Sequence, residues 1–186
     1  LNPDFPLNFP RYRGASVLIT GFSGTAKTTL SAAFALAACD RGEPTIFVSL
    51  DSDNREVIRN LDAVNLHLED HVNSGLLMML KARSLAGSPE SYLVRLKRLA
   101  VEHKARCVVI DPMSTWYMSG AEVSAYGVAE RLINWAKASG ITLVCTRLLD
   151  EMSTLSENSS PMQISALVDS WIHLSYLVQD GERNRG

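Results

Sequence analysis

The segment GFSGTAKT, residues 21–28, combines glycines, a lysine and a threonine at a spacing that suits phosphate binding. The common phosphate-binding loop reads G-x-x-x-x-G-K-[ST], and Ala26 stands here at the second glycine. Backbone N–H groups and the helix dipole would attract the phosphates, Lys27 would act on the β- and γ-phosphates, and Thr28 would ligate magnesium. The segment predicts an ATP and Mg²⁺ site formed by Gly21, Ser23, Gly24, Thr25, Ala26, Lys27, Thr28 and Thr29.

The alternative interpretation of this segment is a glycine-containing turn between a strand and a helix, with Lys27 facing solvent. The context favours the nucleotide site, because the apolar run SVLIT precedes the loop and a long alanine-rich stretch follows it.

A bound Mg²⁺ needs a second acidic anchor, and the apolar run CVVID supplies one by ending in Asp111. Strands often finish in a turn-forming aspartate, so Asp111 alone is weak evidence for a metal site. Its combination with the phosphate loop earlier in the chain strengthens that interpretation. We expect Asp111 and Thr28 to hold the metal.

Hydrolysis also needs a base that orients or deprotonates water, and Asp51 follows another apolar run directly. The alternative role for Asp51 is the N-cap of a helix that starts near residue 54, which Ser52 or Asp53 could fill equally well. Asp51 is the candidate catalytic base beside Lys27, and both alternatives stay open from the sequence.

These residues need rigid elements to bring them together, and the sequence alternates short apolar runs with helical patterns. Because most of the runs are apolar throughout, they predict strands covered on both faces. The result is a three-layer α/β fold with a mostly parallel central sheet. We expect strands at 16–20, 45–50, 75–80, 106–111, 141–146 and 170–178, helices near 27–41, 54–61, 89–104 and 122–139, and a mobile loop at 150–163.

Length and composition predict a single domain over residues 1–186. The net charge of -2 gives no global attraction to nucleic acid or anionic lipid, and no apolar run is long enough to span a membrane. Three cysteines within apolar segments suit a reducing cytoplasm. We therefore expect a cytoplasmic protein that binds neither membranes nor nucleic acid.

The order of motifs resembles the KaiC branch of the RecA-like P-loop ATPases. The resemblance runs through GASVLITGFSGTAKTTLS, PTIFVSLDSDNREVIRN, ARCVVIDPMSTW and DSWIHLSYLVQDGERNRG, of which the final GERNRG is a rather specific mark. It implies a RecA-type ATPase core, an ATP site between adjacent subunits and a homo-oligomeric ring, commonly a hexamer. In KaiC itself one such domain also phosphorylates itself.

The chain departs from the family pattern at several positions. MCM helicases and MoxR-type ATPases are similar in carrying alanine at the position of Ala26. Two consecutive glutamates of the family correspond to Asp51 and Ser52, which implies slow hydrolysis. The Ser-Thr phosphorylation pair corresponds to Ser165 and Ala166, so Ser165 is the candidate phosphoacceptor, against the interpretation of an ordinary helix-end serine. Family members continue past GERNRG with a basic strand, so this chain is either a fragment or lacks those groups.

Two other functions compete with a KaiC-like ATPase. A RecA-type DNA-dependent ATPase would need a basic or aromatic pore loop, and segment 147–163 offers Arg147 beside Asp150, Glu151 and Glu157. A non-catalytic ATP-binding module would explain why Asp51 and Ser52 stand at the positions of the two family glutamates. A metal site at His67 and His71 would need both side chains on one helical face and a third ligand, so two surface histidines are the preferred interpretation.

Overall fold

A sheet of six parallel strands lies at the centre of the fold, in the order β3-β2-β4-β5-β1-β6. This protein's computed structural model describes residues 13–81, 88–116, 122–149, 164–179 and 182–185. The strands are β1 (Ser16–Gly21), β2 (Thr45–Ser49), β3 (Leu77–Lys81), β4 (Cys107–Asp111), β5 (Thr142–Leu148) and β6 (Ser170–Leu174).

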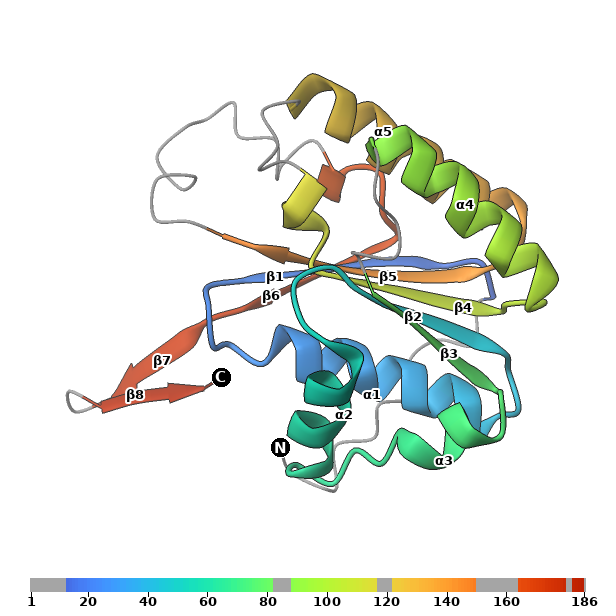
Figure 1. Ribbon diagram of the computed structural model, residues 1–186. Coiled ribbons are helices and arrows are strands. Elements are labelled where there is room, and N and C mark those ends of the chain that lie inside the picture. Colours follow the sequence, from blue (N-terminus) through green and yellow to red (C-terminus); the bar gives the residue numbers. More distant parts are fainter. Residues whose placement is uncertain (1–12, 82–87, 117–121, 150–163, 180–181, 186) are drawn as a thin grey trace.

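Helices cover both faces of this sheet, which gives three layers (Figure 1). On one face lie α1 (Lys27–Asp40), α2 (Asn54–Asp62) and α3 (Glu69–Asn73), and on the other lie α4 (Pro89–Glu102) and α5 (Glu122–Ala138). A short 3-10 helix, η2 (Met113–Trp116), follows β4. The predicted three-layer α/β fold with a mostly parallel sheet is confirmed.

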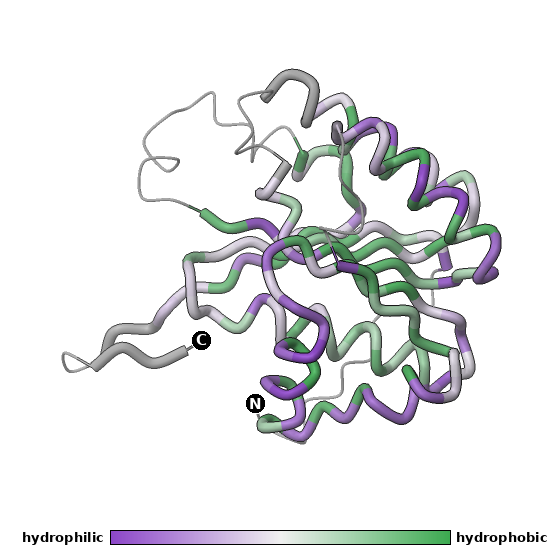
Figure 2. The backbone as a smooth tube through the Cα atoms, in the orientation of Figure 1, coloured by the Kyte–Doolittle hydropathy of each residue, from purple (hydrophilic) through white to green (hydrophobic). Residues whose placement is uncertain are grey.

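The apolar strands are buried because each face of the sheet packs against helices. Leu18 contributes to a core with Leu96 of α4 and Leu132 of α5, whereas its neighbour Ile19 packs with Phe34 of α1 on the opposite face. The hydrophobic residues of the strands accordingly form the centre of the molecule in Figure 2. This two-sided burial explains why the strands lack polar alternation.

The strand order determines which chain segments meet at the carboxyl edge of the sheet. Strands β1 and β4 both pair with β5, so their carboxyl ends lie two strand spacings apart, about 10 Å. The phosphate loop after β1 therefore faces Asp111 at the end of β4. In open parallel sheets this edge is where ligands bind.

The C-terminal part of the fold differs from the predicted single strand at 170–178. β6 ends at Leu174, which pairs with Gly21, and the chain continues into β7 (Tyr176–Gln179). Beyond Gly21, β1 has become a loop and offers no further backbone partners. β7 instead pairs antiparallel with β8 (Glu182–Arg185), and this hairpin projects away from the sheet (Figure 1).

One helix of the structure was not predicted from the sequence. The helix α3 has five residues, which are too few to show a periodicity. The predicted loop at 150–163 lies outside the described residues, together with its acidic side chains. Among the described residues, no helix has the length and apolar character needed to cross a bilayer.

Candidate functional site

The phosphate loop closes on a single backbone carbonyl. Phe22 O accepts hydrogen bonds from Thr25 Oγ1 at 2.9 Å and from Lys27 Nζ at 2.6 Å. The lysine side chain therefore folds back over the loop at the N-terminus of α1. Lys27 lines the cleft, so a phosphate group bound there would compete with Phe22 O for the same ammonium group.

Close contacts explain the glycine at position 21, and backbone conformation explains the one at position 24. A Cβ atom on Gly21 would lie 2.5 Å from Thr25 Oγ1 and 2.6 Å from Leu174 O, so the strand β6 leaves no room for a side chain. Gly24 has a φ of +78°, a conformation that residues with a side chain rarely adopt. The loop geometry thus requires glycine at both positions.

Ala26 has a left-handed backbone conformation, which the glycine of the common loop pattern would adopt more easily. Its φ of 68° and ψ of 27° lie in the left-handed region, and it directly precedes α1. An alanine in this region costs roughly 1–2 kcal/mol. Ala26 also lines the cleft, so its methyl group takes up space close to any phosphate bound there.

Asp111 lies almost fully buried at the end of β4. Thr146 Oγ1 of β5 donates to Asp111 Oδ1, and the Thr28 hydroxyl at the start of α1 lies close enough to favour the charged carboxylate. Burial raises the pKa of Asp111, while the two hydroxyls and the charge of Lys27 oppose that shift. Burial likewise lowers the pKa of Lys27, against the attraction of Asp111.

The adjoining oxygens of Thr28 and Asp111 are suited to a magnesium ion. Hydroxyl and carboxylate groups are hard ligands of the kind that Mg²⁺ prefers, usually together with phosphate oxygens and water. Both side chains line the same cleft, and the Thr28 hydroxyl is near enough to lower the pKa of Asp111. The donor set therefore fits the expected ion.

The loop after β2 separates the two roles that the sequence left open for Asp51. Asp53 is the N-cap of α2, because its carboxylate accepts a hydrogen bond of 3.0 Å from Arg55 N. Asp51 accepts one from Ser52 Oγ at 3.1 Å, is exposed, and lines the cleft. The capping role thus falls to Asp53, and Asp51 remains available to face a substrate.

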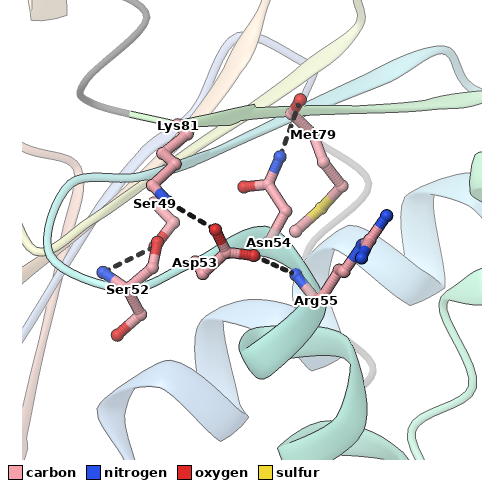
Figure 3. Close-up of polar contacts among 7 residues, drawn as sticks. All are labelled: Ser49, Ser52, Asp53, Asn54, Arg55, Met79 and Lys81. Carbon is pink, nitrogen blue, oxygen red and sulfur yellow. Dashed lines mark hydrogen bonds and ion pairs between the residues drawn. The ribbon is translucent and has the colours of Figure 1, made fainter.

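Several hydrogen bonds fix the loop that carries Asp51 (Figure 3). Ser49 is buried; its Oγ donates to Ser52 O at 2.8 Å and accepts from Ser52 N at 3.2 Å. Asp53 forms an ion pair with Lys81 at the end of β3. In addition, Leu50 N donates to Asp111 O at 2.8 Å, which ties the loop to the end of β4.

These elements surround one cleft with a volume of about 360 Å³. Gly21 and Thr25 of the predicted site do not line it: Gly21 ends β1, and the Thr25 side chain donates to Phe22 O within the loop. The lining adds two residues that the sequence did not indicate, Pro112 and Leu148. The lining residues are Ser23, Gly24, Ala26, Lys27, Thr28, Thr29, Asp51, Asp111, Pro112 and Leu148.

Other candidate residues lie away from this cleft. Ser165 is half-buried near the start of the described segment 164–179 and is not part of the lining. Arg147 is only 8% exposed within β5, so its guanidinium is not presented to a nucleic acid as a pore-loop residue would be. The three cysteines are free and buried.

The two histidines do not share a helical face, which corrects the geometry assumed for a metal site. α3 begins at Glu69, so His67 precedes the helix and only His71 belongs to it. His67 pairs with Asp62, whereas His71 lies 3.1 Å from Asp40 of α1. No group of three metal-binding side chains occurs in the part of the chain that the structure describes.

Comparison with known proteins agrees with this geometry. The family described as "ATPase: KaiC" matches residues 9–186. A circadian clock protein KaiC2 from Synechocystis sp. is 34% identical over 174 residues, which cover 94% of this chain and 31% of that protein. A circadian clock oscillator protein KaiC from Picosynechococcus sp. is 25% identical over 94% of this chain and 34% of its own length. The chain thus spans about a third of the length of these relatives.

Proposed function

Because this chain belongs to the KaiC family of ATPases, we propose that its cleft binds ATP with Mg²⁺ and hydrolyses it slowly. The observation that carries this proposal is the convergence of Lys27, Thr28, Asp111 and Asp51 on one cleft from three different strand ends. The fold is RecA-like, and its carboxyl edge supplies every one of these groups.

Each residue has a distinct part in the proposed reaction. Lys27 moves from Phe22 O to the β- and γ-phosphate oxygens. Thr28 and Asp111 would hold a magnesium ion, which when bound would neutralise phosphate charge. Asp51 accepts a proton from the attacking water while that water's oxygen bonds to the γ-phosphorus. The bond between this phosphorus and the β–γ bridging oxygen breaks, and the products are ADP and inorganic phosphate.

Two residues of the loop after β2 support the proposal that ATP hydrolysis is slow. Asp51 has a shorter side chain than the glutamate at the corresponding family position, and Ser52 supplies a hydroxyl in place of the second carboxylate. The Ser52 hydroxyl donates to Asp51, so it also occupies one of the carboxylate lone pairs that a water would use. The same observation favours a second candidate, a module that binds ATP without turnover.

We further propose a homo-oligomeric ring, hexameric by resemblance, with the site at a subunit interface. Trp171 on the edge strand β6 donates its indole N–H to Thr20 Oγ1 and is 52% exposed, and we propose that this exposed ring belongs to the contact surface. Ser165 does not line this chain's cleft, so any autokinase reaction would transfer phosphate to it from a neighbouring subunit's ATP.

Steady-state ADP production by matched variants tests the enzymatic proposal. Asp51→Asn is expected to lower turnover by roughly two to four decades without weakening Mg-ATP binding, as for a lost general base. Asp53→Asn is the control, because asparagine caps a helix about as well as aspartate and only an exposed ion pair is lost. Ser52→Glu is expected to raise the rate.

Turnover must be compared at matched oligomer mass, measured on the same preparations. Equal rates for the parent and Asp51→Asn would remove Asp51 from the reaction. If all variants bind Mg-ATP and none releases ADP, the chain is the nucleotide-binding module instead.

A further inference from the structure

Tyr176 contacts the phosphate loop from outside the motif. It is the first residue of β7, directly beyond the edge strand β6, and its Oη donates to Ser23 O at 2.8 Å. A Cβ atom on Gly24 would lie 2.5 Å from the same Oη. The phenol hydroxyl therefore lies against the Ser23–Gly24 peptide, 153 residues away from it in the chain.

This contact determines which way the Ser23–Gly24 peptide faces. In a planar trans peptide the C=O and the following N–H point in opposite directions. Since Ser23 O points toward Tyr176, the N–H of Gly24 points away from it. Both residues line the cleft, and the glycine with a φ of +78° could otherwise adopt other peptide orientations at little cost.

We propose that Tyr176 is a positioning residue that holds the N–H of Gly24 toward the phosphates of a nucleoside di- or triphosphate. It acts through the loop and does not itself contact the nucleotide. This inference rests on the proposed nucleotide-binding function of the cleft. It adds to the site a residue that lies outside the recognisable phosphate-loop pattern.

The hydroxyl is not needed to attach this part of the chain to the sheet. β6 pairs with β1 from Val17↔Ser170 to Gly21↔Leu174, so the residues just before Tyr176 are already fixed by backbone hydrogen bonds. Gly21 also packs against Leu174. Removing the hydroxyl alone is therefore expected to leave the fold intact and to free one loop peptide.

Calorimetric titration of Tyr176→Phe tests this role, with Tyr126→Phe as the matched control. Tyr126 is half-buried against the core on the α5 side of the sheet, away from the loop. The probes are Mg-ADP, Mg-pyrophosphate and adenosine. The loss of one oriented amide is expected to weaken both phosphate-bearing probes about five- to tenfold and to leave adenosine unchanged.

Titration of the parent protein, and the thermal midpoint of each protein without ligand, separate a positioning role from a structural role and from failure of the proposed function. Unchanged affinity of Tyr176→Phe for pyrophosphate would overturn the positioning role while leaving the proposed function intact. An equal loss for adenosine, or a fall in thermal midpoint beyond that of Tyr126→Phe, would show a structural role and also overturn it. A parent that binds none of the probes would contradict the proposed function and the inference together.

Discussion

Replacing Ala26 by glycine is expected to stabilise the protein, which is the reverse of the usual effect of glycine in or beside a helix. Ala26 has a φ of 68°, and relieving this left-handed conformation gains roughly 1–2 kcal/mol. The added freedom of glycine in the unfolded chain costs about 0.4–1 kcal/mol. The net expectation is a gain of about 0.8 kcal/mol in the free energy of unfolding, between limits of roughly 0 and 1.6 kcal/mol.

The matched control is Ala37→Gly within the same helix. Ala37 lies at the start of the last turn of α1 and is half-buried, so glycine there is expected to destabilise the protein by up to about 1 kcal/mol. Urea unfolding of both variants without nucleotide measures the two effects, which should have opposite signs.

Nucleotide affinity gives a second readout for Ala26→Gly. Because Ala26 lines the cleft, removal of its methyl group is expected to leave Mg-ATP affinity unchanged or higher. If Ala26→Gly destabilised the protein as much as Ala37→Gly, the left-handed backbone at this position would be refuted. A collapse of Mg-ATP binding would refute the steric part of the reasoning.

Two further predictions concern the loop after β2 and the opposite edge of the sheet. Ser49→Ala removes the hydroxyl that holds Ser52, and it is expected to lower the free energy of unfolding by about 1 kcal/mol and to slow ATP turnover. Ser88→Ala removes the cap of α4 and should lower stability by a similar amount without slowing turnover. Urea unfolding measures the stability of both variants, and equal ATP turnover rates for the two would contradict this prediction. Asp169 is exposed; a small degree of desolvation favours its neutral form, but hydrogen bonds from Lys137 and Ser16 lower its pKa to about 2. Because the folded pKa of Asp169 is depressed, its contribution to stability is fully present at neutral pH and is lost as the pH falls through about 2. The urea midpoints of the parent and Asp169→Ala should therefore differ at pH 7, begin to approach each other below about pH 5 and converge near pH 2, whereas a constant difference would argue against these hydrogen bonds to Asp169.

The layers of the fold could be predicted from the sequence because strands buried on both faces have a distinctive composition. The cap of α4 was also predictable, since Ser88 and Pro89 form a local signal that tertiary contacts do not change. The hairpin of β7 and β8 was not, because the end of β6 depends on where its partner β1 turns into the loop. A continuous apolar run cannot show that interruption.

The candidate site was predictable in part for a similar reason. Lys27 and Asp111 belong to local patterns at strand ends, and the sheet order brings them together. The contact of Thr146 with Asp111 could be recognised only from the strand order, which places β5 between β1 and β4. The position of Thr146 at the end of an apolar run was the one signal in the sequence. Tyr176 has no local signal, since its role depends on a contact across most of the chain.

Titration of Mg-ATP into the parent and into Lys27→Ala tests the central claim most directly. Lys97→Ala is the control, because Lys97 lies on α4 over the Trp135 ring, away from the cleft. The account predicts saturable binding to the parent and to Lys97→Ala, and a loss of at least tenfold in affinity for Lys27→Ala, as expected for a charge-assisted phosphate contact. Equal binding by all three proteins, or no heat beyond dilution in the parent at millimolar ATP, would contradict the assignment of this cleft as the nucleotide site.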